Sequence, residues 1–461
     1  MPLPITERLF KVRENGTTVR TELLGGATTF VTMAYIMVIN PAILGFAGIP
    51  QGPSTVATIL AAAFGSLLMG FYANRPIAVA PYMGENAFIA FGLAMMGIGW
   101  QQRLGSVFIS GLVFALITLL KVRSWLANSI SISLKHSFAV GIGLFLAFIG
   151  LYETGIVISA AAGMAPQALL RGSSTVLSAP DVPVKIGNLR SPEVLLAIFG
   201  FLLISFFLYR RIRGGILLGI AATAVLGTLV GLGKSPQAVV ALPFVGKYSL
   251  GPVALKLDIL SVLRLSFLPI LLTLFLMSFL DTLGTLVGVG AAGKMIDEKG
   301  NFPDIERPMM VDAAACMFSA LVGTSTSGAY IESATGIREG ARTGLAAVTA
   351  GALFIVSLFF IPLIEPLQQL RYAYGPALVA VGLLMMGSVT KIDFGDLTEL
   401  IPAFATIVMM IFTYNIANGL TAGLVLYPAF KLFAGRGREL NGGSIVLGLL
   451  CLVYYIFGLP H

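Results

Sequence analysis

"GAYIESATGIREG", residues 328–340, is a short run of small residues with an acid, Glu332, near its centre. Gly328 and Gly336 interrupt it, and the β-prone residues 329–331 lie directly before the acid. Apolar stretches flank it on both sides in a chain with only 11% charged residues. An acid inside a membrane span costs about 2.5–3.5 kcal/mol on insertion scales, so it is a functional candidate by default. We expect an extended arm here, followed by a half-helix from Ser333 onward.

"RPIAVAPYMGENAFIAFG", residues 75–92, has the same layout. Pro81 and Gly84 interrupt it after the β-prone residues 77–80, and Glu85 follows the break. Interrupted segments in matching positions of two halves of a chain indicate the binding site of a secondary transporter. Irregular backbone at membrane depth must be covered by protein or line a watery cavity. We expect two half-helix N-termini to face each other there and to offer N–H groups to a polar ligand.

The composition predicts an integral membrane protein. The chain has 461 residues, 57% of them hydrophobic, and its charged fraction is less than half of the roughly 25% usual in soluble domains. Long apolar runs separated by polar breaks favour helices over a barrel. About fourteen spans are predicted, near residues 23–45, 54–73, 77–98, 104–122, 136–158, 194–211, 214–233, 266–291, 309–324, 326–340, 343–365, 373–389, 399–414 and 417–433.

The interrupted segments are the third and the tenth of these spans, so each is third in its half. An odd number of spans per half gives the halves opposite orientations, which predicts an inverted repeat. The spans place the strong basic clusters on one side, including those of the N-terminal segment 1–22 and of residues 431–438. The excess of basic residues in cytoplasmic loops predicts that both segments are cytoplasmic. Residues 434–461 are expected at the membrane interface.

Four polar residues, including Glu332 of the opening motif, are the leading site candidates. Asp281 interrupts the apolar stretch "FLMSFLDTLGTLVGVG", and its alternative role is to hold a neighbouring helix. Asn86 offers a donor and an acceptor to an amide-like ligand edge. Glu85 either binds ligand or caps its own half-helix. Glu332 is expected to bind ligand, the alternative being a solvated loop or a pair with Arg338.

Further candidates surround these acids. Ser333 would suit a polar cavity, and Thr32 either contacts ligand or only bonds its own helix backbone. Three aromatic side chains could stack on a flat ligand or simply pack in the core: Tyr82, Tyr330 and Phe30.

Several functions are disfavoured. Both cysteines, Cys316 and Cys451, lie in apolar surroundings, so neither a disulfide nor a metal site is expected. No nucleotide-binding loop is present, which argues against ATP-driven transport. The net charge of +8 comes from basic residues between spans rather than from a nucleic-acid surface. We expect no enzyme activity, no cofactor and no nucleic-acid partner.

The chain resembles the nucleobase:cation symporter-2 family, in its branch of adenine, guanine and hypoxanthine permeases. The resemblance rests on four motifs in order and covers nearly the whole chain: "TERLFKVRENGTTVRTELLGGATTFVTMAYIMVINPAIL", "APYMGENAFIAF", "DTLGTLVGVG" and "ESATGIREGARTGL". It implies a core and a gate domain in each half, proton-coupled uptake and often a homodimer. The implied ranges are a first repeat 23–233 (core 23–122, gate 136–233) and a second repeat 266–433 (core 266–365, gate 373–433).

The resemblance also implies roles for individual residues. The family's site acid on span ten matches Glu332, its span-three asparagine matches Asn86, and its span-eight acid matches Asp281. Two departures lie near the expected site. The usual third-span pattern is closer to APGMGLNAF, so Tyr82 and Glu85 stand here for Gly and Leu. Many purine permeases have an acid three residues before the matched span-eight acid, whereas this chain has Ser278.

The expected function is therefore proton-coupled uptake of a purine across a bacterial inner membrane. Glu332 would accept hydrogen bonds from the base, and Asp281 or Glu332 would take the proton. The main alternatives are a transporter for xanthine or uracil and an anion transporter of the same fold. The three acids argue against an anion, and the clustering of polar residues at two breaks argues against a pore.

Overall fold

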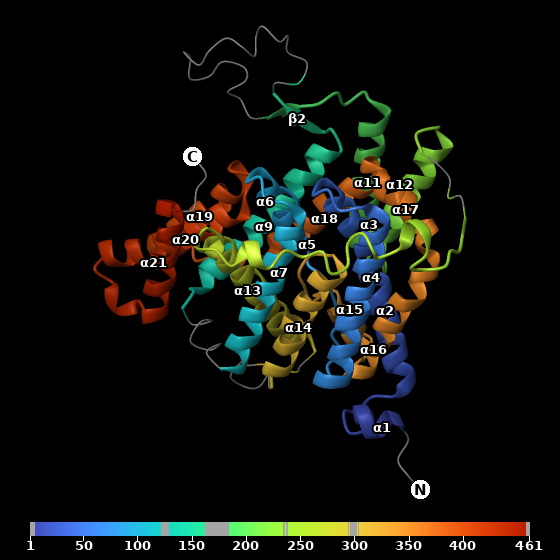
Figure 1. Cartoon of the computed structure of the whole chain (residues 1–461), viewed down its shortest axis with the longest axis horizontal. Coiled ribbons are helices and arrows are strands. Elements are labelled where there is room, and N and C mark those ends of the chain that lie inside the picture. Colours follow the sequence, from blue (N-terminus) through green and yellow to red (C-terminus); the bar gives the residue numbers. More distant parts are fainter. Residues whose placement is uncertain are drawn as a thin grey trace.

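The computed structural model describes residues 5–457 apart from 121–128, 161, 163–183, 234–235, 237, 294, 296–301 and 303. The described part is mostly helical, with helices crossing one compact body (Figure 1). This confirms the all-α prediction.

Nine helical segments of the described part are long and apolar enough to cross a membrane. They are α2 (Val19–Met33) with α3 (Ile36–Phe46), α4 (Gln51–Leu68) with a π-helical turn (Met69–Ala73), α7 (Trp100–Leu119), α9 (Ile132–Glu153), α11 (Pro192–Tyr209), α13 (Leu268–Ala292), α16 (Gly344–Ser357) with α17 (Ile361–Gln369), α18 (Arg371–Met385) and α20 (Ile416–Phe433). Three shorter helices coincide with further predicted spans: α12 (Gly215–Leu229), α14 (Glu306–Val322) and α19 (Leu397–Phe412). The remaining two predicted spans are the interrupted segments.

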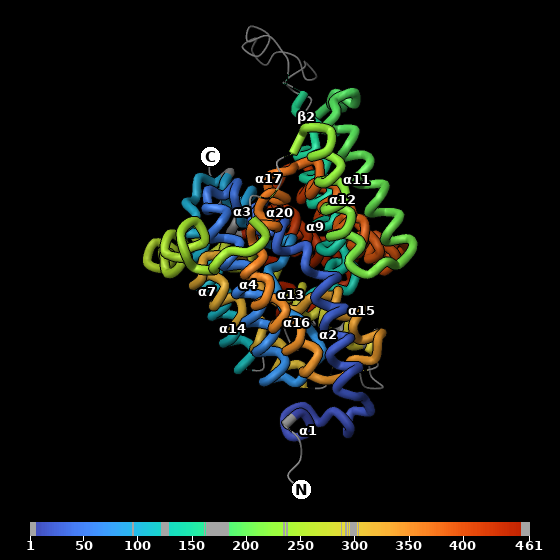
Figure 2. Tube along the Cα trace, turned by 90° about the vertical axis from the view of Figure 1, so that its right-hand side faces the viewer, coloured from blue at the N-terminus to red at the C-terminus, as the bar shows by residue number. Residues whose placement is uncertain are grey.

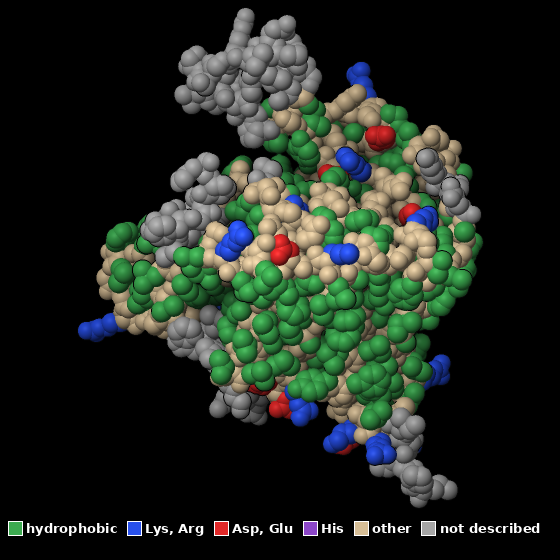
Figure 3. Space-filling model, in the orientation of Figure 1, with side chains coloured by type: hydrophobic (Ala, Val, Ile, Leu, Met, Phe, Trp, Pro, Cys, Tyr) green, Lys and Arg blue, Asp and Glu red, His purple; other side chains and the backbone are tan. Residues whose placement is uncertain are grey.

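The surface agrees with a membrane location. In Figure 3 a broad apolar face covers the middle of the molecule, and Lys, Arg, Asp and Glu gather at rims above and below it. Apolar side chains exposed on this scale need lipid or protein against them.

The helices pack in two groups. α2, α4, α7, α14 and α16 pack on one another, and α9 packs on α18, α19 and α20, with α11 and α12 beside α18. Figure 2 shows α2, α4, α14 and α16 near the N-terminal α1 (Ile5–Phe10), with α9, α11 and α12 further from it. The groups correspond to the expected core and gate, while the predicted range boundaries stay predictions.

The two interrupted segments meet in a two-stranded antiparallel sheet. β1 (Val79–Pro81) pairs with β4 (Ser327–Ala329), with Ala80 opposite Gly328. α5 (Met83–Ala87) follows β1 and continues through a π-helical turn (Phe88–Gly92) into α6 (Leu93–Met95), and α15 (Ser333–Arg338) follows β4. The arm and half-helix prediction is thus confirmed for both segments. A second small sheet pairs β2 (Val157–Ser159) with β3 (Val184–Ile186).

Several details of that prediction were wrong. The first arm is Val79–Pro81 rather than residues 77–80. The second arm is Ser327–Ala329 rather than residues 329–331, because the Ala329 N–H donates to Asp312 Oδ2 at 2.9 Å and fixes the register there. Gly336 lies inside α15 and does not interrupt it. A Cβ on Gly336 would stand 2.2 Å from the Gly25 carbonyl oxygen, so its glycine permits close packing of α15 on α2.

Gly84 likewise lies inside α5 rather than at a break. A Cβ at this position would stand 2.5 Å from Ile142 Cγ2 on α9. The glycine therefore allows a half-helix of one group to approach a long helix of the other.

Acids near both ends of the chain fix helix ends. Buried Glu22 on α2 accepts from the Arg342 N–H at 2.7 Å, just before α16.

At the far end of α20, Lys431 lies 2.9 Å from Glu439, and Arg436 lies 2.7 Å from Asp396. Hydrogen bonds, chiefly from Thr398, hold the pKa of Asp396 well below its usual range. The last described helix is α21 (Gly442–Phe457). The membrane side of these segments stays a prediction.

Candidate substrate site

Glu332 is held by a tyrosine from the first span. It stands directly before α15 and is half-buried, and Tyr35 Oη donates to its Oε1 at 2.6 Å. Tyr35 is buried at the junction of α2 and α3. Among the described residues, Tyr35 is the side chain that donates a hydrogen bond to the Glu332 carboxylate. The structure thus leaves acceptor capacity on this carboxylate and gives it Tyr35, rather than Arg338, as its partner.

Thr32 bonds its own helix backbone, and its contact with ligand stays a prediction. Its Oγ1 donates to backbone carbonyls of its own helix, with Thr28 O at 3.0 Å and Thr29 O at 2.8 Å. The same hydroxyl lies 3.1 Å from Thr335 Oγ1 on α15. It therefore ties the first span to the half-helix that follows Glu332.

The aromatic candidates occupy two places. Phe30 packs edge-on against Phe354 of α16, with ring centroids 5.0 Å apart. The rings of Tyr82 and Tyr330 lie nearly parallel, with centroids 6.4 Å apart and an interplanar angle of 10°. Tyr330 Oη donates to Pro81 O at 2.5 Å, so it also fastens the two arms together. Stacking of these rings on a ligand stays a prediction.

Ser333 has a structural contact. It is buried, and its Oγ accepts from the Ala78 N–H at 3.0 Å. The hydroxyl therefore fixes the start of α15 against the arm of the other interrupted segment. A contact between Ser333 and ligand stays a prediction.

Glu85 meets Ser278 across the site. Ser278 Oγ donates to Glu85 Oε2 at 2.9 Å, and both side chains are buried. Glu85 thus bonds α13 instead of capping its own half-helix. Glu85 and Ser278, which both depart from the family pattern, are thus in direct contact. A sequence alone cannot show this contact.

Asn86 is buried beside Glu85. Its Nδ2 lies 3.4 Å from Asn40 O, a long hydrogen bond to α3. Among the described residues, Glu85 Oε1 and Asn86 Oδ1 have no hydrogen bond of acceptable geometry. Buried acceptors without donors are costly. The Thr326 hydroxyl, which also lacks such a bond, can donate to Glu85. Asn86 Oδ1 is therefore the acceptor here that best suits a ligand with an N–H group.

Asp281 and Asp312 divide the two roles that were considered for Asp281 alone. Asp281 is half-buried on α13, and its carboxylate has no hydrogen bond within the described part. Buried Asp312 on α14 holds the neighbouring elements instead: its Oδ2 accepts from Thr282 Oγ1 at 2.8 Å and Tyr82 Oη at 3.4 Å, besides Ala329 N–H. Asp281 therefore stays a candidate for proton transfer.

Sequence reasoning missed Tyr35 and Asp312. The available signal for Asp312 was an acid inside the apolar span near 309–324, and for Tyr35 a tyrosine close to the threonines of the first span. Neither signal names a partner. The assembled site is a polar centre of carboxylates, hydroxyls and amides enclosed by apolar helices, which suits hydrogen bonding to an uncharged polar ligand.

Comparisons with known proteins agree with this arrangement. The sequence profile of the permease family Xan_ur_permease matches residues 20–421. The putative permease MJ0326 of Methanocaldococcus jannaschii is 41% identical over 458 residues, covering 99% of both chains. The adenine permease AdeP of Escherichia coli is 38% identical, covering 98% of this chain and 96% of that one. The guanine/hypoxanthine permease PbuG of Bacillus subtilis is 37% identical, covering 97% and 99%.

Solved structures share the fold at low identity. The transmembrane domain of the cyanobacterial bicarbonate transporter BicA superposes with a TM-score of 0.64 at 17% identity, covering 88% of this chain and 97% of that domain. SLC26A9 superposes with a TM-score of 0.60 at 12% identity, covering 93% of this chain and 67% of that one. This is a core-and-gate transporter fold. With the match of sequence over almost its whole length, the chain belongs to the nucleobase:cation symporter-2 permease family and is a multi-pass membrane transporter.

Proposed function

We propose that this protein takes up purine nucleobases across the plasma membrane, the inner membrane in a bacterium, and couples uptake to protons. Relatives over nearly the full length are named as adenine and as guanine/hypoxanthine permeases. The observation that carries the proposal is the Glu332 carboxylate, oriented by Tyr35 and placed where two interrupted spans meet. A carboxylate so held can accept the N–H groups of a base.

In the proposed mechanism, the base lies between the two interrupted segments. Glu332 accepts ring or exocyclic N–H groups, and backbone N–H groups at the start of α5 donate to the acceptor edge of the base. Tyr82, Tyr330 or Phe30 stacks on the ring.

Asp281 carries the coupled proton, because its carboxylate is poorly solvated and has no hydrogen-bond partner among the described residues. The core then moves past the gate in an elevator-like step. A homodimer stays an expectation of the family resemblance.

The decisive test is uptake of labelled adenine, guanine and hypoxanthine by cells that express Glu332→Gln. We expect uptake to fall at least a hundredfold while the protein stays in the membrane. Glu193→Gln, an exposed acid at the start of α11, is the matched control and should transport normally. Normal uptake by Glu332→Gln would defeat the assignment.

Ligand class and coupling need separate measurements. A base that binds only the folded protein should raise its melting temperature in detergent. A shift with xanthine or uracil alone, or with an anion alone, would favour the alternative substrates. Accumulation of base should stop when the proton gradient is collapsed, and Asp281→Asn should bind base without concentrating it.

A further inference from the structure

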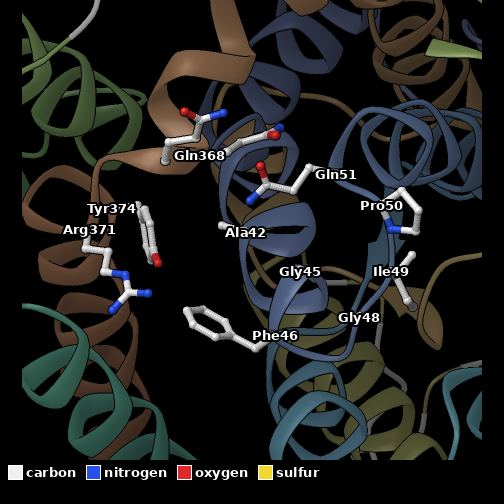
Figure 4. A pocket seen from close by; sticks show the side chains of 11 residues that line it. Ala42, Gly45, Phe46, Gly48, Ile49, Pro50, Gln51, Gln368, Arg371 and Tyr374 are labelled. Carbon is white, nitrogen blue, oxygen red and sulfur yellow. The ribbon is translucent and has the colours of Figure 1, made fainter. Parts of the chain in front are cut away.

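A cleft lies away from the Glu332 site. Its volume is about 410 Å³, and it is lined by the end of α3, the start of α4 and the junction of α17 with α18 (Figure 4). Ala42 lines it, two helical turns beyond Tyr35, or about 10 Å along the axis. Clefts of 300–1,000 Å³ are of the size that binds small molecules.

One wall of the cleft holds the side-chain amide of Gln51 above the backbone of Gly45. Gly48, with φ +81°, ends α3 in a tight turn whose N–H groups return to Leu44 and Gly45. The turn brings the start of α4 back over α3, and a Cβ on Gly45 would stand 3.3 Å from Gln51 Nε2. The Gln51 amide has no hydrogen bond among the described residues. By contrast, Gln368 Nε2 already donates to Met37 O at 2.9 Å. Gln369 also lines the cleft, and its side chain is exposed.

The adjoining wall, formed by Phe46 at the end of α3 and by Arg371 and Tyr374 of α18, is aromatic and without net charge. The Arg371 guanidinium lies over the Phe46 ring, 5.3 Å from its centroid, and Phe46 is 39% exposed. Arg371 is paired with Glu153 at 3.4 Å, to which Tyr374 Oη also donates. The acid neutralises the guanidinium, so the wall favours a flat neutral ligand over an anion. Figure 4 shows Phe46, Arg371 and Tyr374 around the same open space.

Phe46 also begins a chain of ring contacts between the two helix groups. Its centroid lies 5.5 Å from that of Phe91, which lies 5.8 Å from that of Tyr414. Tyr414 in turn lies 5.2 Å from Phe145 on α9. A ring that stacks on Phe46 would therefore lie one ring away from the contact of Phe91 with Tyr414, which joins core and gate.

We propose that this cleft is a second binding site for the transported base. We call it the outer site because it lies towards the end of the molecule away from α1 (Figures 1 and 2). It would take a flat, neutral heteroaromatic ring that stacks on Phe46 and pairs its adjacent donor and acceptor with the Gln51 amide. Glutamine amides pair in this way with the edge of adenine, and aromatic side chains stack on any base. The inference rests on the proposed function, because it assigns the cleft the same substrate class as the Glu332 site.

Protection of an engineered cysteine tests occupancy. Cys316 and Cys451 are buried, so a Gln369→Cys variant of the full chain offers an accessible thiol to a maleimide at an exposed residue that lines the cleft and keeps Gln51 in place. Adenine or hypoxanthine should slow its modification at least threefold, in the otherwise unaltered chain and also together with Glu332→Gln. Gln101→Cys, exposed at the start of α7, should not be protected. Absence of protection, or protection only with Glu332 intact, would overturn the outer site.

Uptake kinetics provide a second measurement. Phe46→Ala and Gln51→Ala should each raise the half-saturating base concentration about tenfold, within the range of stacking and pairing contributions, and change maximal uptake less than twofold. Gln101→Ala should match the unaltered protein. An unchanged half-saturating concentration in both variants would reject the proposal. If the unaltered protein transports no purine, the proposed function itself is wrong. If it transports purine but both variants behave like it, only the outer site is wrong.

Discussion

At the scale of single residues, the orientation of Glu332 depends on one phenol. Tyr35→Phe removes the hydroxyl that donates to Oε1 at 2.6 Å and leaves the ring in place. A hydrogen bond to a charged group contributes about 1.5–3 kcal/mol, so uptake at low base concentration should fall roughly tenfold or more. Labelled-purine uptake measures this. Tyr372→Phe, whose buried phenol makes only a long bond to Leu232 O at 3.4 Å, is the control. Equal uptake by both variants would show that Glu332 needs no such donor.

The contact between Glu85 and Ser278 makes a second prediction. Glu85→Leu should reduce uptake, because it removes a buried carboxylate from the polar centre. Adding Ser278→Glu to that variant returns a carboxylate to the same place from the facing helix, since the two side chains lie 2.9 Å apart. We expect the double variant to recover much of the lost uptake. A double variant no more active than Glu85→Leu would mean that the position of the carboxylate, and not only its presence, matters.

At the scale of elements, the interrupted spans could be predicted but their register could not. Glycine, proline and a β-prone stretch act locally, so residues 75–92 and 328–340 predicted arms and half-helices correctly. The register depends instead on long-range bonds such as Asp312 to Ala329 and Tyr330 to Ala78. No local pattern contains those partners.

The same limit explains the residues that were missed. Asn40 on α3 donates to Thr58 Oγ1 at 2.7 Å and to Thr324 Oγ1 at 2.9 Å, joining the first span to the loop before β4. Sequence periodicity can place such a residue on a buried face, but the identity of its partners comes from packing of distant spans. Acids at breaks were found because they disturb a pattern, whereas Asn40 and Tyr35 do not.

Asp312 makes the prediction that belongs to this scale. One of its oxygens accepts from Thr282, Tyr82 and the backbone of β4, so it fastens α13, the third span and the tenth span. Asp312→Ala leaves buried donors unpaired at about 1–3 kcal/mol each and should lower the melting temperature in detergent by several degrees. Asp312→Asn keeps one acceptor oxygen, so its melting temperature should lie between those of the alanine variant and the unaltered protein. An alanine variant that melts like the unaltered protein would contradict the fastening role.

At the scale of the whole molecule, core and gate touch through different chemistry at two ends. At the end away from α1 they meet through aromatic rings, with Phe91 against Tyr414. At the other end the turn between α11 and α12 meets α2 and α15. Gly214 there has φ +67°, and a Cβ on it would stand 2.6 Å from Val31 Cγ1 on α2. In the proposed elevator-like step, movement of one group past the other would break such contacts at one end at a time.

The ion pair at this second end makes the last prediction. Arg213, in the turn before α12, pairs with Glu339, which directly follows α15, and both side chains are exposed. Exposed pairs contribute at most about 1 kcal/mol, so Arg213→Glu should change the uptake rate up to about fivefold without lowering the melting temperature. The double reversal Arg213→Glu with Glu339→Arg should restore the rate, and the effect of the single change should shrink at high salt because screening weakens exposed charges. If this ion pair forms and breaks during transport, opposite charges at the two positions should give the normal uptake rate, and like charges should change it. A double reversal as slow as the single variant would assign the effect to the turn itself.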